Sequence, residues 1–208
     1  MPRVSEASFF TDDARARVGK AVGEAESHTA AEIVVVVRHT SGAWREVDLA
    51  VGAAAAFGVL LVLLFHPRSF AVEGMPVDVA VAFVAGAVLC SAISPFKRLL
   101  LPRKRVAAQV RAKAREAFVD QGVCRTRGRT GILVYASTFE RRVELVVDVA
   151  VDARLLEAQE RALSDSIRRG PDLDAFLEAV RAIGPALSAS LPRSEDDVNE
   201  LPDAPVMS

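Results

Sequence analysis

Two uncharged apolar runs constrain this chain more than any other feature. They cover residues 49–65 and 79–96, and a polar turn bounded by Pro67 and Pro76 separates them. Because an α-helix rises about 1.5 Å per residue and the hydrocarbon core of a bilayer is about 30 Å thick, roughly 20 apolar residues cross a membrane. We therefore predict a transmembrane helical hairpin over residues 47–101. The alternative is a pair of buried helices in a soluble protein.

Basic residues around this hairpin predict its orientation. Residues 97–105 hold five Lys and Arg side chains, Arg45 precedes the first run, and the turn carries Arg68 opposed by Glu73. Because Lys and Arg near membrane ends stay in the cytoplasm, we expect both termini there and the turn on the other side. The polar beginning of the chain has no apolar signal-peptide core.

The segment EIVVVVR, residues 32–38, predicts the first strand of an α/β core. A continuous apolar run between polar ends is typical of a strand buried on both faces. An amphipathic helix at about 12–28 precedes it, with Thr11 as the N-cap. Residues 1–46 cannot bury such a strand alone, so its partner strands lie after the hairpin. The hairpin is therefore expected to be an insertion into one domain.

The second part of this domain is predicted at residues 102–187. Helical spacing indicates a helix at about 103–121, and GILVYAS at 131–137 reads as a second buried strand. The alternation in RVELVVDV, residues 142–149, predicts a strand that forms an antiparallel hairpin with it. Two further helices follow. The predicted fold class is α/β, with a small central mixed β-sheet covered by helices and the transmembrane hairpin inserted after the first strand.

Charge is unevenly distributed, although the formal net charge is −1. Residues 97–142 hold 13 Lys and Arg against 3 Asp and Glu, whereas residues 143–208 hold 6 against 14. The basic segment follows the hairpin directly, so the lipid bilayer and its anionic headgroups are the nearest partner. No nucleic-acid motif accompanies the charge, and we expect no nucleic-acid partner. The acidic end, residues 188–208, has little periodic apolarity and is expected to be mostly disordered.

Four carboxylates at expected loop ends are candidates for a phosphoryl-transfer site. They are Asp12, Asp13, Asp148 and Asp152. In the interpretation we favour, Asp12 and Asp13 only stabilise a helix N-terminus. The three histidines, His28, His39 and His66, lack metal-ligand spacing, and the chain has no Gly-rich phosphate loop. We therefore predict no metal site and no defined catalytic set.

The loop CRTRGRT, residues 124–130, contains the candidate binding residues Arg125, Arg127 and Arg129. The guanidinium fork donates two parallel hydrogen bonds, which suits phosphate and carboxylate groups. The plain alternative is a solvated loop. The cluster predicts an anion-binding site for a lipid headgroup or a membrane protein, and it favours a binding module over an enzyme.

Three stretches carry a resemblance to a known family: TRGRTGILVYAS at 126–137, ERRVELVVD at 140–148 and NELPD at 199–203. With the order of helix, strand, membrane hairpin and basic helix, the chain resembles the TPM-domain family, the TPM phosphatase or DUF477-type proteins. The similarity is to the bacterial branch with membrane helices inside the domain, and it covers about residues 9–203. It implies an α/β sandwich and a place in the bacterial inner membrane.

The resemblance also implies two kinds of function. Some family members are linked to acid phosphatase activity or divalent-cation binding, and others to assembly of membrane complexes. Members carry acidic residues before the second strand, where this chain has Arg129 and Thr130. We therefore predict a membrane-anchored, non-catalytic binding or assembly module at the cytoplasmic face. The alternative is a weak acid-phosphatase-type or cation-dependent phosphohydrolase, with a divalent cation as its cofactor.

Overall fold

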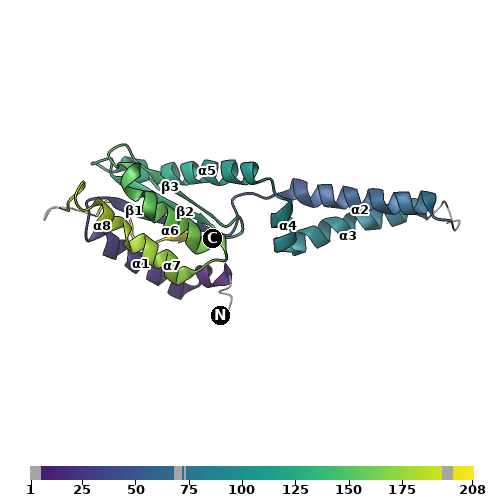
Figure 1. Ribbon diagram of the computed structural model, residues 1–208, viewed down its shortest axis with the longest axis horizontal. Coiled ribbons are helices and arrows are strands. Elements are labelled where there is room, and N and C mark those ends of the chain that lie inside the picture. Colours follow the sequence, from purple (N-terminus) through teal and green to yellow (C-terminus); the bar gives the residue numbers. More distant parts are fainter. Residues whose placement is uncertain (1–5, 68–71, 73, 194–198) are drawn as a thin grey trace. The chain divides into compact units, whose positions relative to one another are not determined.

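The computed structural model describes residues 6–67, 72, 74–193 and 199–208 (Figure 1). The chain divides into two compact units. Unit 1 consists of Met1–Ser41 and Val106–Ser208, and unit 2 consists of Gly42–Arg105. Unit 1 is thus built from two parts of the chain that are separated by the whole of unit 2.

A mixed sheet of four strands forms the centre of unit 1 in the part of the chain that the structure describes. The strands are β1 (Glu32–Arg38), β2 (Gly131–Ser137), β3 (Arg142–Val147) and β4 (Val206–Met207), in the order β3-β2-β1-β4. β1 pairs in parallel with β2 over its full length, from Glu32 opposite Gly131 onward. β2 and β3 are antiparallel, as predicted. The expected pairing of the first strand across the insertion is therefore confirmed.

Helices cover both faces of this sheet. The helices of unit 1 are α1 (Asp12–Glu26), α5 (Arg103–Asp120, of which the first three residues belong to unit 2), α6 (Glu157–Arg168), α7 (Leu173–Arg181) and α8 (Ile183–Leu187), with short 3-10 turns η1 (Glu6–Phe10), η2 (Val123–Arg125) and η3 (Ala153–Leu156). In Figure 1, α5 lies on one side of the sheet and α1, α6 and α7 on the other. This arrangement places the chain in the α/β class.

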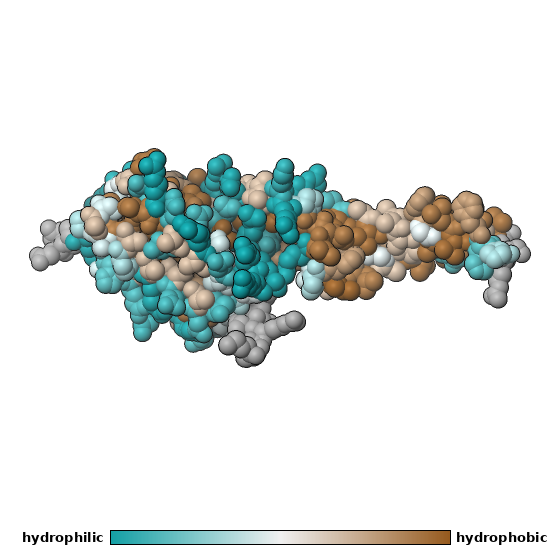
Figure 2. Space-filling view, in the orientation of Figure 1, coloured by the Kyte–Doolittle hydropathy of each residue, from teal (hydrophilic) through white to brown (hydrophobic). Residues whose placement is uncertain are grey.

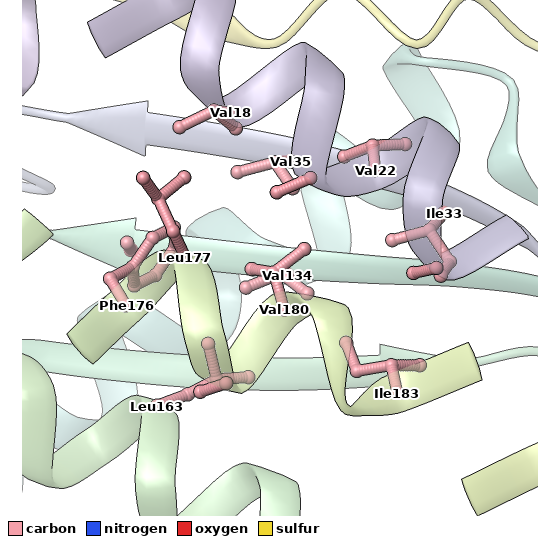
Figure 3. Packing of buried hydrophobic residues seen from close by; sticks show 14 of the residues in the cluster. Val18, Val22, Ile33, Val35, Val134, Leu163, Phe176, Leu177, Val180 and Ile183 are labelled. Carbon is pink, nitrogen blue, oxygen red and sulfur yellow. The ribbon is translucent and has the colours of Figure 1, made fainter. Parts of the chain in front are cut away.

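The hydrophobic core lies between the sheet and α1, α6, α7 and α8. Alternate residues of β1, Ile33, Val35 and Val37, point into it, because successive side chains of a strand face opposite sides. Figure 3 shows Val35 between the helices, with Phe176 of α7 nearby. At the roughly 25 cal/mol per Å² of buried apolar surface, each such side chain contributes about 1.5–3 kcal/mol.

Unit 2 contains two long apolar helices, α2 (Arg45–Phe65) and α3 (Met75–Ala92), and a short third helix, α4 (Ser94–Leu100). α2 has 21 residues and α3 has 18, so both are long and apolar enough to cross a membrane. The two pack closely where Gly52 meets Gly86, since a Cβ on Gly86 would lie 3.2 Å from the Gly52 Cα. Figure 2 shows the surface of these helices to be mostly hydrophobic.

The hairpin differs from the prediction at two points. The second apolar run is broken at Ile93 rather than continuing to Phe96, because Pro95 lacks an N–H and suits the first turn of the new helix α4. The first helix starts at Arg45 and so includes Asp48, which precedes the uncharged run of residues 49–65. Asp48 is largely buried, and its carboxylate lies 2.7 Å from the Lys97 ammonium. The predicted turn residues 68–71 and 73 lie outside the described residues.

The acidic end also differs from the expectation of disorder. Residues 194–198 lie outside the described residues, but β4 pairs in parallel with β1 at Val36 and Val37. Ahead of it, the backbone N–H groups of Glu200 and Leu201 both donate to the Glu32 carboxylate. The edge of β1 offers unpaired backbone groups, and a short segment with little apolar periodicity satisfies them.

Candidate functional site

Asp12 and Asp13 lie in the exposed first turn of α1. Thr11 is the N-cap, and its hydroxyl oxygen accepts a hydrogen bond from the Ala14 N–H at 3.1 Å. Two carboxylates in a first turn stabilise the positive end of the helix dipole, by about 0.3–1 kcal/mol each. Their position is therefore explained by the helix itself.

Asp148 follows β3 and is buried, with a side chain only 3% exposed. Its Oδ1 accepts a hydrogen bond from the Val149 N–H at 2.7 Å. Its Oδ2 lies 3.2 Å from Arg129 Nε, an ion pair whose geometry falls short of a hydrogen bond. Arg129 also donates from Nη1 to the Cys124 carbonyl oxygen at 2.7 Å. The carboxylate thus neutralises and orients one of the candidate arginines.

Asp152 has a local role as well. It is the N-cap of η3, and its Oδ1 accepts a hydrogen bond from the Arg154 N–H at 3.0 Å. A capping carboxylate satisfies a backbone donor that the turn itself leaves unpaired. Like Asp148, it is explained by the structure around it.

The four candidate carboxylates do not form one cluster. The Phe10 ring, at the end of η1 and two residues before α1, lies 6.2 Å from the His39 ring, just past the end of β1. The Asp148 N–H instead donates to the carbonyl oxygen of Gly131, which pairs with the first residue of β1. At about 3.3 Å per residue, the seven residues of β1 separate these ends of the sheet by roughly 20 Å. Asp12 and Asp13 therefore lie far from Asp148 and Asp152.

The loop that holds Arg125, Arg127 and Arg129 lies at the Asp148 end of the sheet and is fixed by several contacts. Thr126 Oγ1 accepts the Thr130 N–H at 3.2 Å, and Thr130 Oγ1 donates to the carbonyl oxygen of residue 30 at 3.1 Å. The three arginines are exposed. Neither the Arg125 nor the Arg127 guanidinium forms an ion pair with any residue that the structure describes.

One carboxylate of the chain already binds this loop. Glu200 Oε2 accepts a hydrogen bond from the Arg127 backbone N–H at 3.0 Å. The Arg127 N–H is therefore occupied by the chain itself, and the exposed guanidinium groups of Arg125 and Arg127 are the donors that suit a carboxylate or phosphate oxygen of a ligand.

No group of three or more His, Cys, Asp and Glu side chains is placed to hold a metal ion anywhere in the described ranges. His28, His39 and His66 come from separate parts of the chain.

A buried carboxyl group that the sequence analysis did not single out lies at the end of α1. Burial, with a smaller contribution from the neighbouring Glu32 and Asp203 carboxylates, raises the pKa of Glu26 to about 8. Its Oε1 accepts the Ile33 N–H at 2.7 Å. The group lines a small pocket together with Arg193 and Asp203. The only sequence signal was an acid at an apolar position of the α1 pattern.

Comparison with known proteins gives a likeness of fold. No protein-family model and no curated protein matches the chain. Among solved structures, the NMR structure of BA42 protein from the psychrophilic bacterium Bizionia argentinensis matches with a TM-score of 0.57 at 14% sequence identity. The match covers 95% of this chain and 94% of that chain. At this identity the likeness shows a shared fold and nothing about activity.

Proposed function

We propose that this protein is a membrane-anchored member of the TPM-domain family that acts as a non-catalytic binding or assembly module. In this proposal α2 and α3 cross the bacterial inner membrane, and unit 1 lies at its cytoplasmic face. The family motifs at residues 126–137, 140–148 and 199–203 support the assignment, as does the fold shared with a bacterial protein.

The observation that carries the proposal is the contrast between the candidate carboxylates and the candidate arginines. Asp148 is neutralised by Arg129, and Asp152 caps a turn. Arg125 and Arg127 are exposed beside an N–H that already binds a carboxylate. A phosphoryl-transfer site needs converging catalytic groups, whereas an anion-binding site needs exposed, preorganised donors. The arrangement favours binding.

The position of the loop favours a protein partner over lipid. The chain leaves unit 1 after Ser41, shortly past the end of β1. It returns to unit 1 at Val106, within α5. The Gln109 amide donates to the Ser41 carbonyl oxygen at 3.0 Å, so both crossing points lie at the carboxyl end of β1. The arginine loop lies at the other end of the sheet. Because the loop is at the end of the sheet away from the connections to unit 2, we propose an acidic segment of a membrane protein as its ligand.

Co-purification from membranes in mild detergent tests the proposal. The informative variant is Arg125→Ala with Arg127→Ala, and Arg129 stays because its removal would leave the Asp148 carboxylate buried without a cation. The matched control is Arg161→Ala with Arg168→Ala, two exposed arginines of α6. We expect the loop variant to lose a partner that the wild type and the control retain. Identical partners in all three would contradict the proposal.

Liposome flotation separates the two sources of the anion. The wild type and the loop variant are compared on vesicles with and without anionic lipid, at low and high salt, because exposed charges are screened. If a protein is the partner, both should float equally. If the variant floats less than the wild type on anionic vesicles but equally on neutral ones, the ligand is an anionic lipid.

We also expect no appreciable phosphatase turnover. The family's acids before β2 are replaced by Arg129 and Thr130, and three arginines in one loop repel a divalent cation. Phosphate release from a phosphomonoester is measured with and without Mg²⁺, Mn²⁺ and Ca²⁺. Robust metal-dependent release by the wild type, lost in Asp148→Asn, would overturn the non-catalytic assignment.

A further inference from the structure

A polar pocket of about 270 Å³ lies in unit 1, on the face of the sheet that α5 covers. Its origin is geometric. Four strands about 4.8 Å apart span roughly 14 Å, whereas a helix with its side chains is about 10 Å across. Over this face α5 is the one helix among the described residues, and it lies beside Glu144 of β3 through Arg111. The helix therefore does not cover the part of the sheet around β1, and the pocket lies there, with Val36 and Tyr135 in its lining.

One end of the pocket carries hydroxyl groups that are positioned by hydrogen bonds to neighbouring residues. Glu140 is buried, and its carboxylate accepts hydrogen bonds from Thr40 Oγ1 and the Ser41 N–H, both at 3.0 Å. The Ser41 hydroxyl lies 3.2 Å from the Tyr135 hydroxyl. Burial raises the pKa of Tyr135, so its hydroxyl stays protonated at neutral pH and remains a donor. These groups are preorganised for a polar ligand.

The lining carries charges of both signs. Arg38 and Lys113 lie with the hydroxyls, and Glu116 and Asp120 follow along α5. Lys113 Nζ lies 2.6 Å from Glu116, but both side chains are about half exposed, and such surface pairs contribute only about 0–1 kcal/mol. A ligand can therefore replace the pair. Lys113 and Asp120 are two turns apart, which is about 10 Å along the helix.

We propose that this pocket binds a short peptide with free termini, two or three residues long. The carboxylate of the peptide pairs with Arg38 and Lys113 and accepts hydrogen bonds from the hydroxyl groups. Its ammonium group pairs with Asp120 and Glu116. Two or three extended residues span roughly 7–10 Å, which matches the spacing of the charges, whereas the charged groups of a single amino acid are too close together. A simple anion would use the cationic end and leave two carboxylates facing it.

A single fluorine label reports on this pocket. The chain contains one tyrosine, Tyr135, so growth on fluorotyrosine places one label in the lining of the pocket. The full chain in detergent is titrated with trialanine, and the fluorine NMR shift is followed. The comparison ligands are trialanine with its amine acetylated, trialanine with its carboxylate amidated, and inorganic phosphate.

The variants are Lys113→Gln and Asp120→Asn, with Arg115→Gln as the matched control, an exposed residue of α5 outside the lining. We expect a saturable shift with trialanine, at least tenfold weaker binding of each blocked peptide, and a tenfold loss in each pocket variant but not in the control. No saturable shift with trialanine, equal binding of the blocked peptides, or a response to phosphate alone would overturn the proposal.

Discussion

The same kind of side chain is buried in unit 1 and exposed in unit 2. Val35 in β1 is 1% exposed, whereas Phe57 in α2 is 61% exposed and Phe65 is 79% exposed. In unit 1 the sheet has helices on both faces, so its apolar residues are covered by the chain itself. In unit 2 two helices pack on one another and leave their outer faces bare.

This difference shows what each unit needs from its surroundings. The layers of unit 1 remove the apolar surface of β1 from solvent, so this surface needs no further cover. The bare faces of α2 and α3 are far larger than the scattered apolar residues of an ordinary soluble surface, and patches of this kind mark protein or membrane interaction sites. In the function we propose, a bilayer covers them.

The largest expected effect comes from placing a charge in each unit. Val35→Asp leaves an unpaired carboxylate in the core and should lower the free energy of unfolding of unit 1 by roughly 3–5 kcal/mol. Thermal unfolding in detergent, followed by circular dichroism and by proteolysis of unit 1, measures this. Phe57→Asp should instead reduce the fraction of the protein in the membrane and leave unit 1 intact. Equal loss of unit 1 in both variants would break the distinction between the units.

A smaller effect concerns the pH dependence of unit 1. Because the folded pKa of Glu26 is about 8 and its ordinary value is 4.5, the folded state keeps a proton that the unfolded state releases. This group's stabilising contribution is full below pH 4.5 and is lost as the pH rises to about 8. Glu26→Gln removes the dependence, so its advantage over wild type should grow across that window to roughly 2–4 kcal/mol.

A neighbouring residue provides the control for this prediction. Glu24 is on the same helix, and its hydrogen bond with Arg181 lowers the pKa of its carboxyl group. Glu24→Gln should therefore give no gain at pH 8. Melting temperatures of the three proteins between pH 5 and 8 decide the matter. Parallel curves for wild type and Glu26→Gln would contradict the assignment.

The smallest effect tests how unit 2 packs. A Cβ on Gly86 would lie 2.8 Å from the Ala55 Cβ, so Gly86→Val forces the two helices apart. Overpacking of this kind costs about 1–3 kcal/mol. Gly58 is the matched position, because a Cβ added there would meet no atom of another helix within 4 Å, and Gly58→Val should be neutral. Crosslinking between cysteines placed on α2 and α3 measures the change, and equal efficiency in both variants would argue against this packing.

The elements of the fold follow closely from the sequence. The predicted strands at 32–38 and 131–137 coincide with β1 and β2, because long β-branched runs have few alternatives. β4 has only two residues, and neither periodicity nor composition marks it. Its position depends on the free edge of β1, which appears only when the sheet is assembled.

The candidate site could be predicted only in part. The exposed arginines were visible as a charged loop, but the pairing of Arg129 with Asp148 depends on how the end of β3 meets that loop. Likewise, the Asp48 and Lys97 pair brings together residues far apart in the chain through the register of α2 and α4. Such pairings are set by tertiary packing, and spacing along the chain does not encode them.

The most direct test of a membrane-anchored module is the sidedness of the two units. In a background of Cys90→Ala and Cys124→Ala, Val72→Cys places a thiol between α2 and α3, and Ala189→Cys places one on unit 1. Intact spheroplasts are treated with a membrane-impermeant maleimide. We predict labelling of the Val72→Cys variant from outside and labelling of the Ala189→Cys variant only after lysis. Labelling at Ala189→Cys before lysis, or recovery of the protein in the soluble fraction, would contradict the account.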